Sequence, residues 1–409
     1  MIYIQDLPSE TFLLEEFNNP FKEPPLLVNA HFHTPYSFSA FNEINDIFIQ
    51  AKEEGIDVLG INDFITMDGY DEFYRLAFEN KIFPLFNVEF MGLMQEEQKK
   101  GIRINDPNNP GRIYFCGKGI SFPVRISEAN QKVLFDVIDN SLKQTRQMVQ
   151  SLNKHLKKIK SRFTLDFDEI QKSFTKGLVR ERHIAKALRI EILKHYKNKQ
   201  EYRSFLKALY DGKESHVENK TPGDLDNELR GTLLKKGGVA FVEEDSGAFL
   251  SLEAIRDIIF DARGIPCYPV LLDDAEGHFT DFEKDFDALI RNLTKHRIYA
   301  VELIPGRNDF KVVKRFTEIF NEKGFLITFG TEHNTPDQAP LTVSCRGKVP
   351  FDEDLLTTNY QSACIIAAHQ YFVAKGKPGY LTPEGFPRLE KQDDFLTIGN
   401  AVIRKFIKV

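Results

Sequence analysis

Short apolar runs recur along the chain, and most of them stop on a polar or charged residue. Runs of this length between turn signals are typical of buried strands, and the intervening stretches have helical spacing. The pattern predicts helices over residues 45–54, 70–80 and 251–262. It predicts strands over residues 26–33, 57–62, 82–88, 112–116, 238–242, 265–272, 299–304 and 325–329. Such alternation is typical of parallel βα units, whose chemistry lies where the strands end.

Long charged helical stretches interrupt this rhythm between residues 128 and 231. We expect helices over 133–156 and 181–209, in an inserted α-helical subdomain. An insertion that leaves from strand ends is expected to cover the active face. The predicted organisation is a first part of a barrel, an inserted helical subdomain, a second part of the barrel and a C-terminal extension packed on it, over residues 1–127, 128–231, 232–340 and 341–409.

The stretch NAHFHTPYSFSAF, residues 29–41, contains the first candidate chemistry. His31 and His33 follow an apolar run and are two residues apart, so in a strand both imidazoles leave on the same face. This arrangement predicts a pair of metal ligands; two histidines that alternate by chance are the alternative. Glu89 and Glu332 also close apolar runs. A buried carboxylate needs a metal or, alternatively, a nearby Arg or Lys.

Composition narrows the class of protein. The chain has 409 residues, of which 42% are hydrophobic and 28% charged, as in ordinary soluble globular proteins. A net charge of -6 argues against a nucleic-acid partner bound through its phosphates. The 4 cysteines show no C-x-x-C spacing, and from the sequence we expect neither a targeting segment nor a membrane-spanning run. We therefore expect a cytoplasmic protein; its oligomeric state stays open.

Six segments, in this order, resemble the polymerase-and-histidinol-phosphatase (PHP) superfamily of metal-dependent phosphoesterases. They are HFHTPYS, GINDF, NVEF, GIP, RHIAKAL and FGTEHN, within residues 26–340. The resemblance implies an α/β fold, a distorted seven-stranded (β/α) barrel that holds up to three zinc, manganese or iron ions at its strand ends.

The resemblance also assigns ligands. It places His31, His33, Glu89 and Glu332 on one metal site, with Glu332 where the family more often has Asp. Other family histidines are replaced, by Phe64, Tyr114, Tyr268 and Asn334. Phe cannot bind a divalent cation, and Tyr and Asn are weaker oxygen ligands. We therefore expect fewer than three ions. A second ion would need Asp273, Glu244, His333 or a tyrosine.

Further side chains are candidates for catalysis or substrate binding. Asp63 is predicted to act as a base or to orient a ligand histidine, with a helix N-cap as the alternative. His333 is a candidate acid, ligand or substrate contact. Arg307 and Lys118 follow strands, where they could clamp an anion or lie on the surface. Three residues of the inserted region, Arg180, Arg182 and His183, could hold phosphate or form a helix N-terminal turn.

These features favour a metal-dependent hydrolase that acts on a small phosphorylated metabolite. A bound cation would lower the pKa of a water molecule and polarise the phosphoryl group. One alternative is a lyase or isomerase that uses a single cation, with Asp63 or His333 moving the proton. The other is a degenerate domain that binds a ligand without catalysis. Metal content and phosphate release distinguish the three.

Overall fold

The computed structural model describes residues 3–17, 24–217, 221–243, 247, 249–333 and 339–408. Two of the candidate ligands, Glu244 and Asn334, lie outside the described residues.

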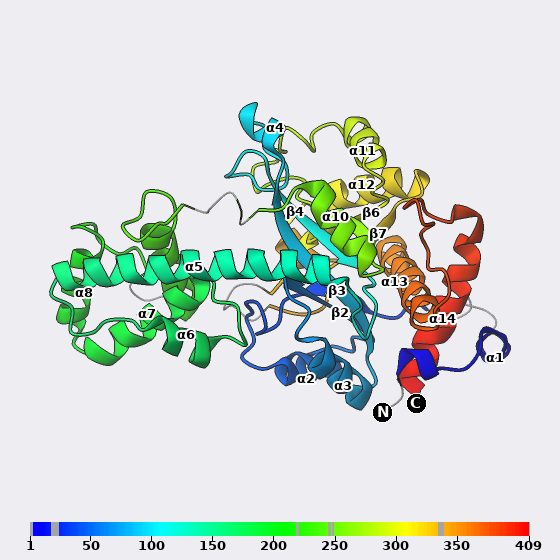
Figure 1. Cartoon of the computed structure of the whole chain (residues 1–409), viewed down its shortest axis with the longest axis horizontal. Coiled ribbons are helices and arrows are strands. Elements are labelled where there is room, and N and C mark those ends of the chain that lie inside the picture. The colour runs from blue at the N-terminus through cyan, green and yellow to red at the C-terminus, as the bar shows by residue number, and fades with distance from the viewer. Residues whose placement is uncertain are drawn as a thin grey trace.

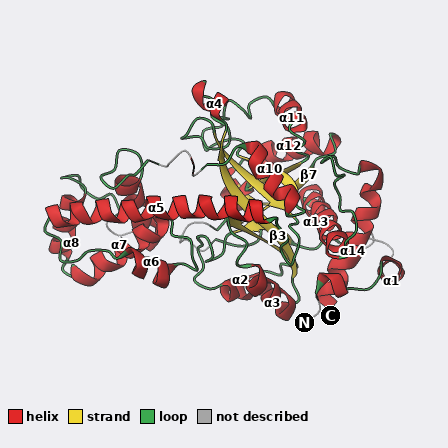
Figure 2. Ribbon diagram, viewed as in Figure 1, coloured by secondary structure: helices red, strands yellow, loops and turns green. Residues whose placement is uncertain are grey.

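A sheet lies at the centre of the molecule, with helices around it (Figure 2). It has seven strands, which are arranged in chain order. The strands are β1 (Val28–Phe32), β2 (Val58–Phe64), β3 (Phe83–Leu93), β4 (Arg112–Lys118), β5 (Ile265–Val270), β6 (Ala300–Leu303) and β7 (Leu326–Phe329). After β7, Glu332 bridges Phe32 of β1, so the sheet nearly closes. The predicted distorted seven-stranded barrel is confirmed.

Two sequence predictions about strands were wrong. β4 is antiparallel to both β3 and β5, whereas we predicted parallel βα units throughout. Two parallel neighbours need a long crossover that returns the chain to the start of the first strand. Only the short helix α4 (Gln95–Lys99) lies between β3 and β4, so β4 runs back alongside β3 instead. Residues 238–242 form no strand. Instead, Ala240 is buried among helices and its N–H donates to Leu233 at 2.9 Å.

Helices surround the barrel (Figure 1). Those near its strands are α2 (Ile44–Glu53), α3 (Tyr70–Asn80), α10 (Leu252–Asp261), α11 (Phe286–Lys295) and α12 (Phe310–Glu322). Near the N-terminus lies the short α1 (Glu10–Glu16), and the C-terminal part contains α13 (Glu353–Ala374) and α14 (Gln392–Lys408). A small second sheet pairs β8 (Ser344–Cys345) with β9 (Val349–Pro350).

α13 closes the remaining gap in the barrel. Buried side chains occur all round it, as expected for a helix inside a protein. Its Asn359 amide donates to the Val28 carbonyl of β1 at 2.9 Å and accepts from the Phe329 N–H of β7 at 3.2 Å. These bonds satisfy backbone groups at the two edges of the sheet, and so hold the seam together.

A long helical segment lies between β4 and β5, and in Figure 1 it extends to the left of the barrel. It consists of α5 (Glu128–Lys158), α6 (Phe167–Phe174), α7 (Glu181–His195), α8 (Lys199–Leu209) and α9 (Pro222–Leu229). The predicted single helix over 181–209 is two helices, because Asn198 caps α8 by accepting from the N–H groups of Gln200 and Glu201. The segment has a hydrophobic core of its own, between Met148 and Ala240. None of the helices described is long and apolar enough to cross a membrane.

Candidate metal centre

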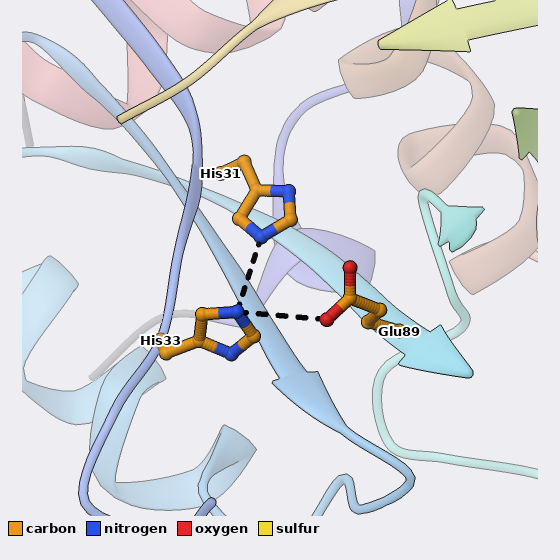
Figure 3. Close-up of side chains that lie close together, drawn as sticks. All are labelled: His31, His33 and Glu89. Atoms are coloured by element: carbon orange, nitrogen blue, oxygen red, sulfur yellow. Dashed lines mark hydrogen bonds and ion pairs between the residues drawn. The ribbon is translucent and has the colours of Figure 1, made fainter. Parts of the chain in front are cut away.

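Three predicted ligands meet at the end of the barrel: His31 on β1, His33 just after it and Glu89 on β3 (Figure 3). The His31 Nε2 and His33 Nε2 atoms lie 3.4 Å apart, and His33 Nε2 lies 3.6 Å from Glu89 Oε2. Ligands about 2.0–2.1 Å from a tetrahedral zinc ion lie roughly 3.3–3.4 Å apart. The group therefore has the donor types and the spacing for one divalent metal ion.

Burial sets the protonation of this group. Desolvation lowers the pKa of His31 and lowers that of His33 well below its ordinary value, so both rings are neutral and can donate a lone pair. Burial, followed by the charge of Glu302, raises the pKa of Glu89 to about 8. A divalent cation would relieve the cost of a buried Glu89 carboxylate.

Glu302 on β6 orients His31 from behind. Its Oε1 lies 2.7 Å from His31 Nδ1, and both groups are buried. The carboxylate selects the tautomer with the proton on Nδ1, which leaves the Nε2 lone pair facing His33 and Glu89. Glu302 was not among the residues predicted from the sequence. Its one signal is a lone Glu inside the otherwise apolar run Ala300–Leu303.

Asp63 holds the loop that carries His33. Its carboxylate accepts from Thr34 N at 2.7 Å and from the Ser37 hydroxyl at 2.6 Å. The same hydroxyl is 3.4 Å from His33 Nδ1, so Asp63 acts on His33 through Ser37. Burial raises the pKa of Asp63 to about 6, against the hydrogen bonds from Ser37 and Thr34. This position corresponds to the orienting role in the prediction; a role as base is untested.

Glu332 is placed differently from the expectation. Its backbone is part of the centre, since its N–H donates to the His31 carbonyl and its carbonyl accepts from His33 N, each at 3.0 Å. Its carboxylate is outside the three-residue ligand group and forms an ion pair with Arg307. Gly330 permits this close approach, because a Cβ there would lie 2.3 Å from the Cβ of His31.

The other predicted residues lie outside the ligand group. His333 has both ring nitrogens engaged, Nδ1 with the Thr331 hydroxyl at 2.7 Å and Nε2 with the Ala339 carbonyl at 2.8 Å. Asp273 pairs with Arg346 at 2.5 Å. Two positions of lost family histidines have structural contacts, since the Tyr268 hydroxyl donates to Glu283 at 2.7 Å and the Phe64 ring lies under Arg180 at 4.7 Å.

Positive charges surround the centre. Arg307 and Arg180 both lower the pKa of Glu89, and Arg182 lowers that of His33. Lys118 was expected after a strand, where it could reach an anion or the surface; instead it is fully buried at the end of β4 and contacts Glu302.

A pocket of about 320 Å³ lies beside the centre. It is bounded by the loop after β1, by α6 and by one face of α7 and α9. Phe38 belongs to this wall and also stacks on His33 at 4.6 Å. Arg182, His183 and Lys186 line the opposite side. The three candidate ligands do not line the pocket; Phe38 lies between His33 and the pocket, whose opposite side carries the cations Arg182 and Lys186.

A family model matches part of the chain, and a solved structure has a similar fold. The family model for the PHP domain matches residues 29–223. A protein from Bifidobacterium adolescentis ATCC 15703, provisionally named a metal-dependent phosphoesterase, has a similar fold: the TM-score is 0.51 at 16% identity, over 83% of this chain and 98% of that chain. An amidohydrolase from Chromobacterium violaceum, solved with bound sulfate and no metal, gives a TM-score of 0.49 at 17% identity, over 81% and 96%.

No curated protein matches the chain. The family match nevertheless begins at Asn29 and includes His31, His33 and Glu89, all within one barrel. Residues 29–223 are therefore similar to the PHP domain, and this segment holds all three ligands of the candidate centre.

Proposed function

We propose that this protein is a metal-dependent hydrolase of phosphate esters, with a small phosphorylated metabolite as its substrate. The observation that carries the proposal is the buried group of His31, His33 and Glu89 next to a pocket with a cationic wall. The similarity of residues 29–223 to the PHP domain, whose superfamily contains metal-dependent phosphoesterases, supports the same reaction class.

His31, His33 and Glu89 would hold a divalent zinc, manganese or iron ion, and Glu302 and Ser37 would fix the two rings. When bound, such an ion supplies a water molecule of lowered pKa and polarises the phosphoryl oxygens. Arg307 carries a guanidinium close to Glu89, where it can hold a non-bridging oxygen of the ester.

The pocket favours an anionic substrate. Arg182 and Lys186 are one turn apart on α7 and therefore share a face. Arg182 donates to the Asn227 amide oxygen at 3.4 Å, and Lys186 donates to that of Asn42 at 3.2 Å. In the described part of the chain these cations thus contact neutral oxygens and form no ion pair with a carboxylate. Burial lowers the pKa of Arg182 to about 10, so its guanidinium still keeps a charge at neutral pH.

The test combines metal loading with phosphate release. Protein stripped by a chelator would be reloaded with zinc, manganese or ferrous ion and assayed on a panel of phosphate monoesters and diesters. We expect phosphate release that depends on the added metal, and loss of both metal and activity in Glu89→Gln. Exposed Glu79, paired with Arg75 at 2.8 Å, provides the control substitution Glu79→Gln.

Two outcomes would contradict the proposal. If wild-type protein retains no divalent metal, then His31, His33 and Glu89 do not form a metal centre. Protein that binds metal but releases phosphate from none of the esters would favour the lyase, isomerase or binding-only alternatives.

A further inference from the structure

The interior of the barrel contains a second set of metal-type donors beside the first. His31, Cys116 and Glu302 have ligand atoms that all lie within 4.8 Å of one another, and all three residues are buried. The two sets share His31, whose Nδ1 faces Glu302 while its Nε2 faces His33. By donor type alone, this second set would suit a soft or borderline ion such as zinc.

A lysine ammonium already lies at this second set. Lys118 is completely buried and its Nζ forms an ion pair with Glu302 Oε2. The other oxygen, Oε1, lies 2.7 Å from His31 Nδ1 and 3.5 Å from Cys116 Sγ. Thr328 donates its hydroxyl to Oε2 at 3.5 Å. Both oxygens of Glu302 are therefore engaged.

Strand geometry explains why the ammonium reaches this position. Cys116 and Lys118 are two residues apart on β4, so their side chains share one face. Cys116 pairs in register with Glu89 of β3, and Lys118 lies further along β4, opposite Ile265 of β5. The antiparallel direction of β4 thus places the lysine deeper in the barrel than the candidate metal ligands.

Electrostatics favour a single cation beside Glu302. An isolated buried ammonium or carboxylate is costly, and the pair of Lys118 with Glu302 offsets both costs. A second divalent ion would have to displace Lys118 from Oε2 and leave its ammonium unpaired beside a dication. We propose that the Lys118 ammonium is a built-in second cation, which positions Glu302 against His31 and prevents a second metal ion from binding.

The inference rests on the metal site of the proposed function, which would then hold one ion per chain. Lys118 acts through Glu302 and His31, so it is a positioning residue. Replacement by methionine keeps an unbranched side chain only one atom shorter and removes its charge. Lys118→Met should therefore free Glu302 from its ion pair, so that Glu302 and the neighbouring Cys116 can bind a second ion.

Cobalt(II) provides the readout, because thiolate ligation gives a charge-transfer band in the near ultraviolet. Wild-type protein is expected to bind one cobalt ion per chain without that band. Lys118→Met should bind two and show the band. The double variant Lys118→Met with Cys116→Ser should lose both the band and the second ion. Cys116→Ser alone should leave one ion and the wild-type spectrum.

Several results would overturn the role of Lys118. They are two cobalt ions or a thiolate band in wild-type protein, a folded Lys118→Met protein with one ion and no band, or loss of the single ion in Cys116→Ser. If Lys118→Met does not fold, the cobalt content and spectra of wild-type protein and Cys116→Ser still test the proposal. Wild-type protein without any bound cobalt would instead refute the metal site of the proposed function, so the two failures are distinguishable.

Discussion

At the residue scale, two histidines that look alike in the sequence have opposite surroundings. His33 directs Nε2 at His31 and Glu89, whereas both ring nitrogens of His333 are already bonded. We expect His33→Asn to lose the metal and His333→Asn to retain it, as measured by elemental analysis after dialysis. Equal metal content in the two variants would show that the ion lies elsewhere.

Tyr268 occupies the position of a lost family histidine but belongs to the core. Its buried hydroxyl donates to the buried Glu283. Tyr268→Phe should leave metal content unchanged and lower the free energy of unfolding by about 0.5–1.5 kcal/mol, since Glu283 loses one donor but keeps the N–H groups of Leu271 and Leu272.

Urea denaturation would measure the effect of Tyr268→Phe. The control is Tyr299→Phe, because the Tyr299 ring packs against Phe325 and its hydroxyl has no hydrogen-bond partner in the described residues. Loss of metal in Tyr268→Phe would contradict the structural role.

The sequence located the ligands better than their supporting residues. His31, His33 and Glu89 could be found because each closes an apolar run. Glu302 was missed, and Lys118 was named only as an anion clamp or surface residue, because their pairing joins β6 to β4 across 184 positions and depends on the direction of β4. The pairing of Glu332 with Arg307 likewise depends on the turn after β7, where Glu332 has a φ of 68°.

At the scale of elements, apolar periodicity recovered the strands of the barrel but gave no direction. A run such as Arg112–Lys118 has the same pattern whether it is parallel or antiparallel. The run over 238–242 was equally ambiguous: its alanine is buried against helices rather than in a sheet. Whether a short apolar segment forms a strand, and in which direction, depends on the parts of the fold that it contacts.

α13 gives a prediction about pH. His369 is fully buried; its Nε2–H donates to the Arg263 carbonyl at 2.6 Å, and its Nδ1 accepts from Tyr380 N at 3.0 Å. Burial lowers its pKa from 6.5 to about 4. Above pH 6.5 its contribution to stability is complete, and it is lost as pH falls toward 4, because the unfolded state then binds the proton first.

The expected contribution of His369 is about 3 kcal/mol between these limits. His369→Gln should flatten that part of the stability profile, as measured by urea unfolding at a series of pH values. A residual slope is expected from His183, whose pKa burial lowers to about 3. An identical profile in wild type and variant would contradict the assignment.

At the scale of the whole molecule, the helical segment and the barrel have separate cores but meet at the candidate centre. Arg180 lies over Phe64, at the carboxyl end of β2, and donates to Ser141 of α5 at 3.0 Å. Lys176 pairs with Glu72 of α3 at 2.7 Å. The helical segment thus contacts the strand-end face of the barrel. The domain boundaries at residues 127, 231 and 340 stay predictions.

The pocket requires both parts, which gives the last prediction. Its barrel side includes Phe38, and its helical side includes Lys186, whose ammonium contacts only the Asn42 oxygen among the described hydrogen-bond partners. If a substrate anion binds here, Lys186→Met should weaken binding of inorganic phosphate about 10- to 100-fold, in line with roughly 1.5–3 kcal/mol for a charged hydrogen bond. Calorimetric titration of metal-loaded protein with phosphate would measure the change.

Lys194 is the matched control, because it lies on the same helix but is exposed and paired with Glu191 at 3.1 Å. Lys194→Met should leave phosphate binding unchanged. The affinity of wild-type protein should also fall with added salt, more steeply than that of Lys186→Met, since screening acts on the charge that the variant lacks. Equal phosphate affinities in the two variants would mean that the substrate anion binds outside this pocket, and that the helical segment contributes to the fold without selecting the substrate.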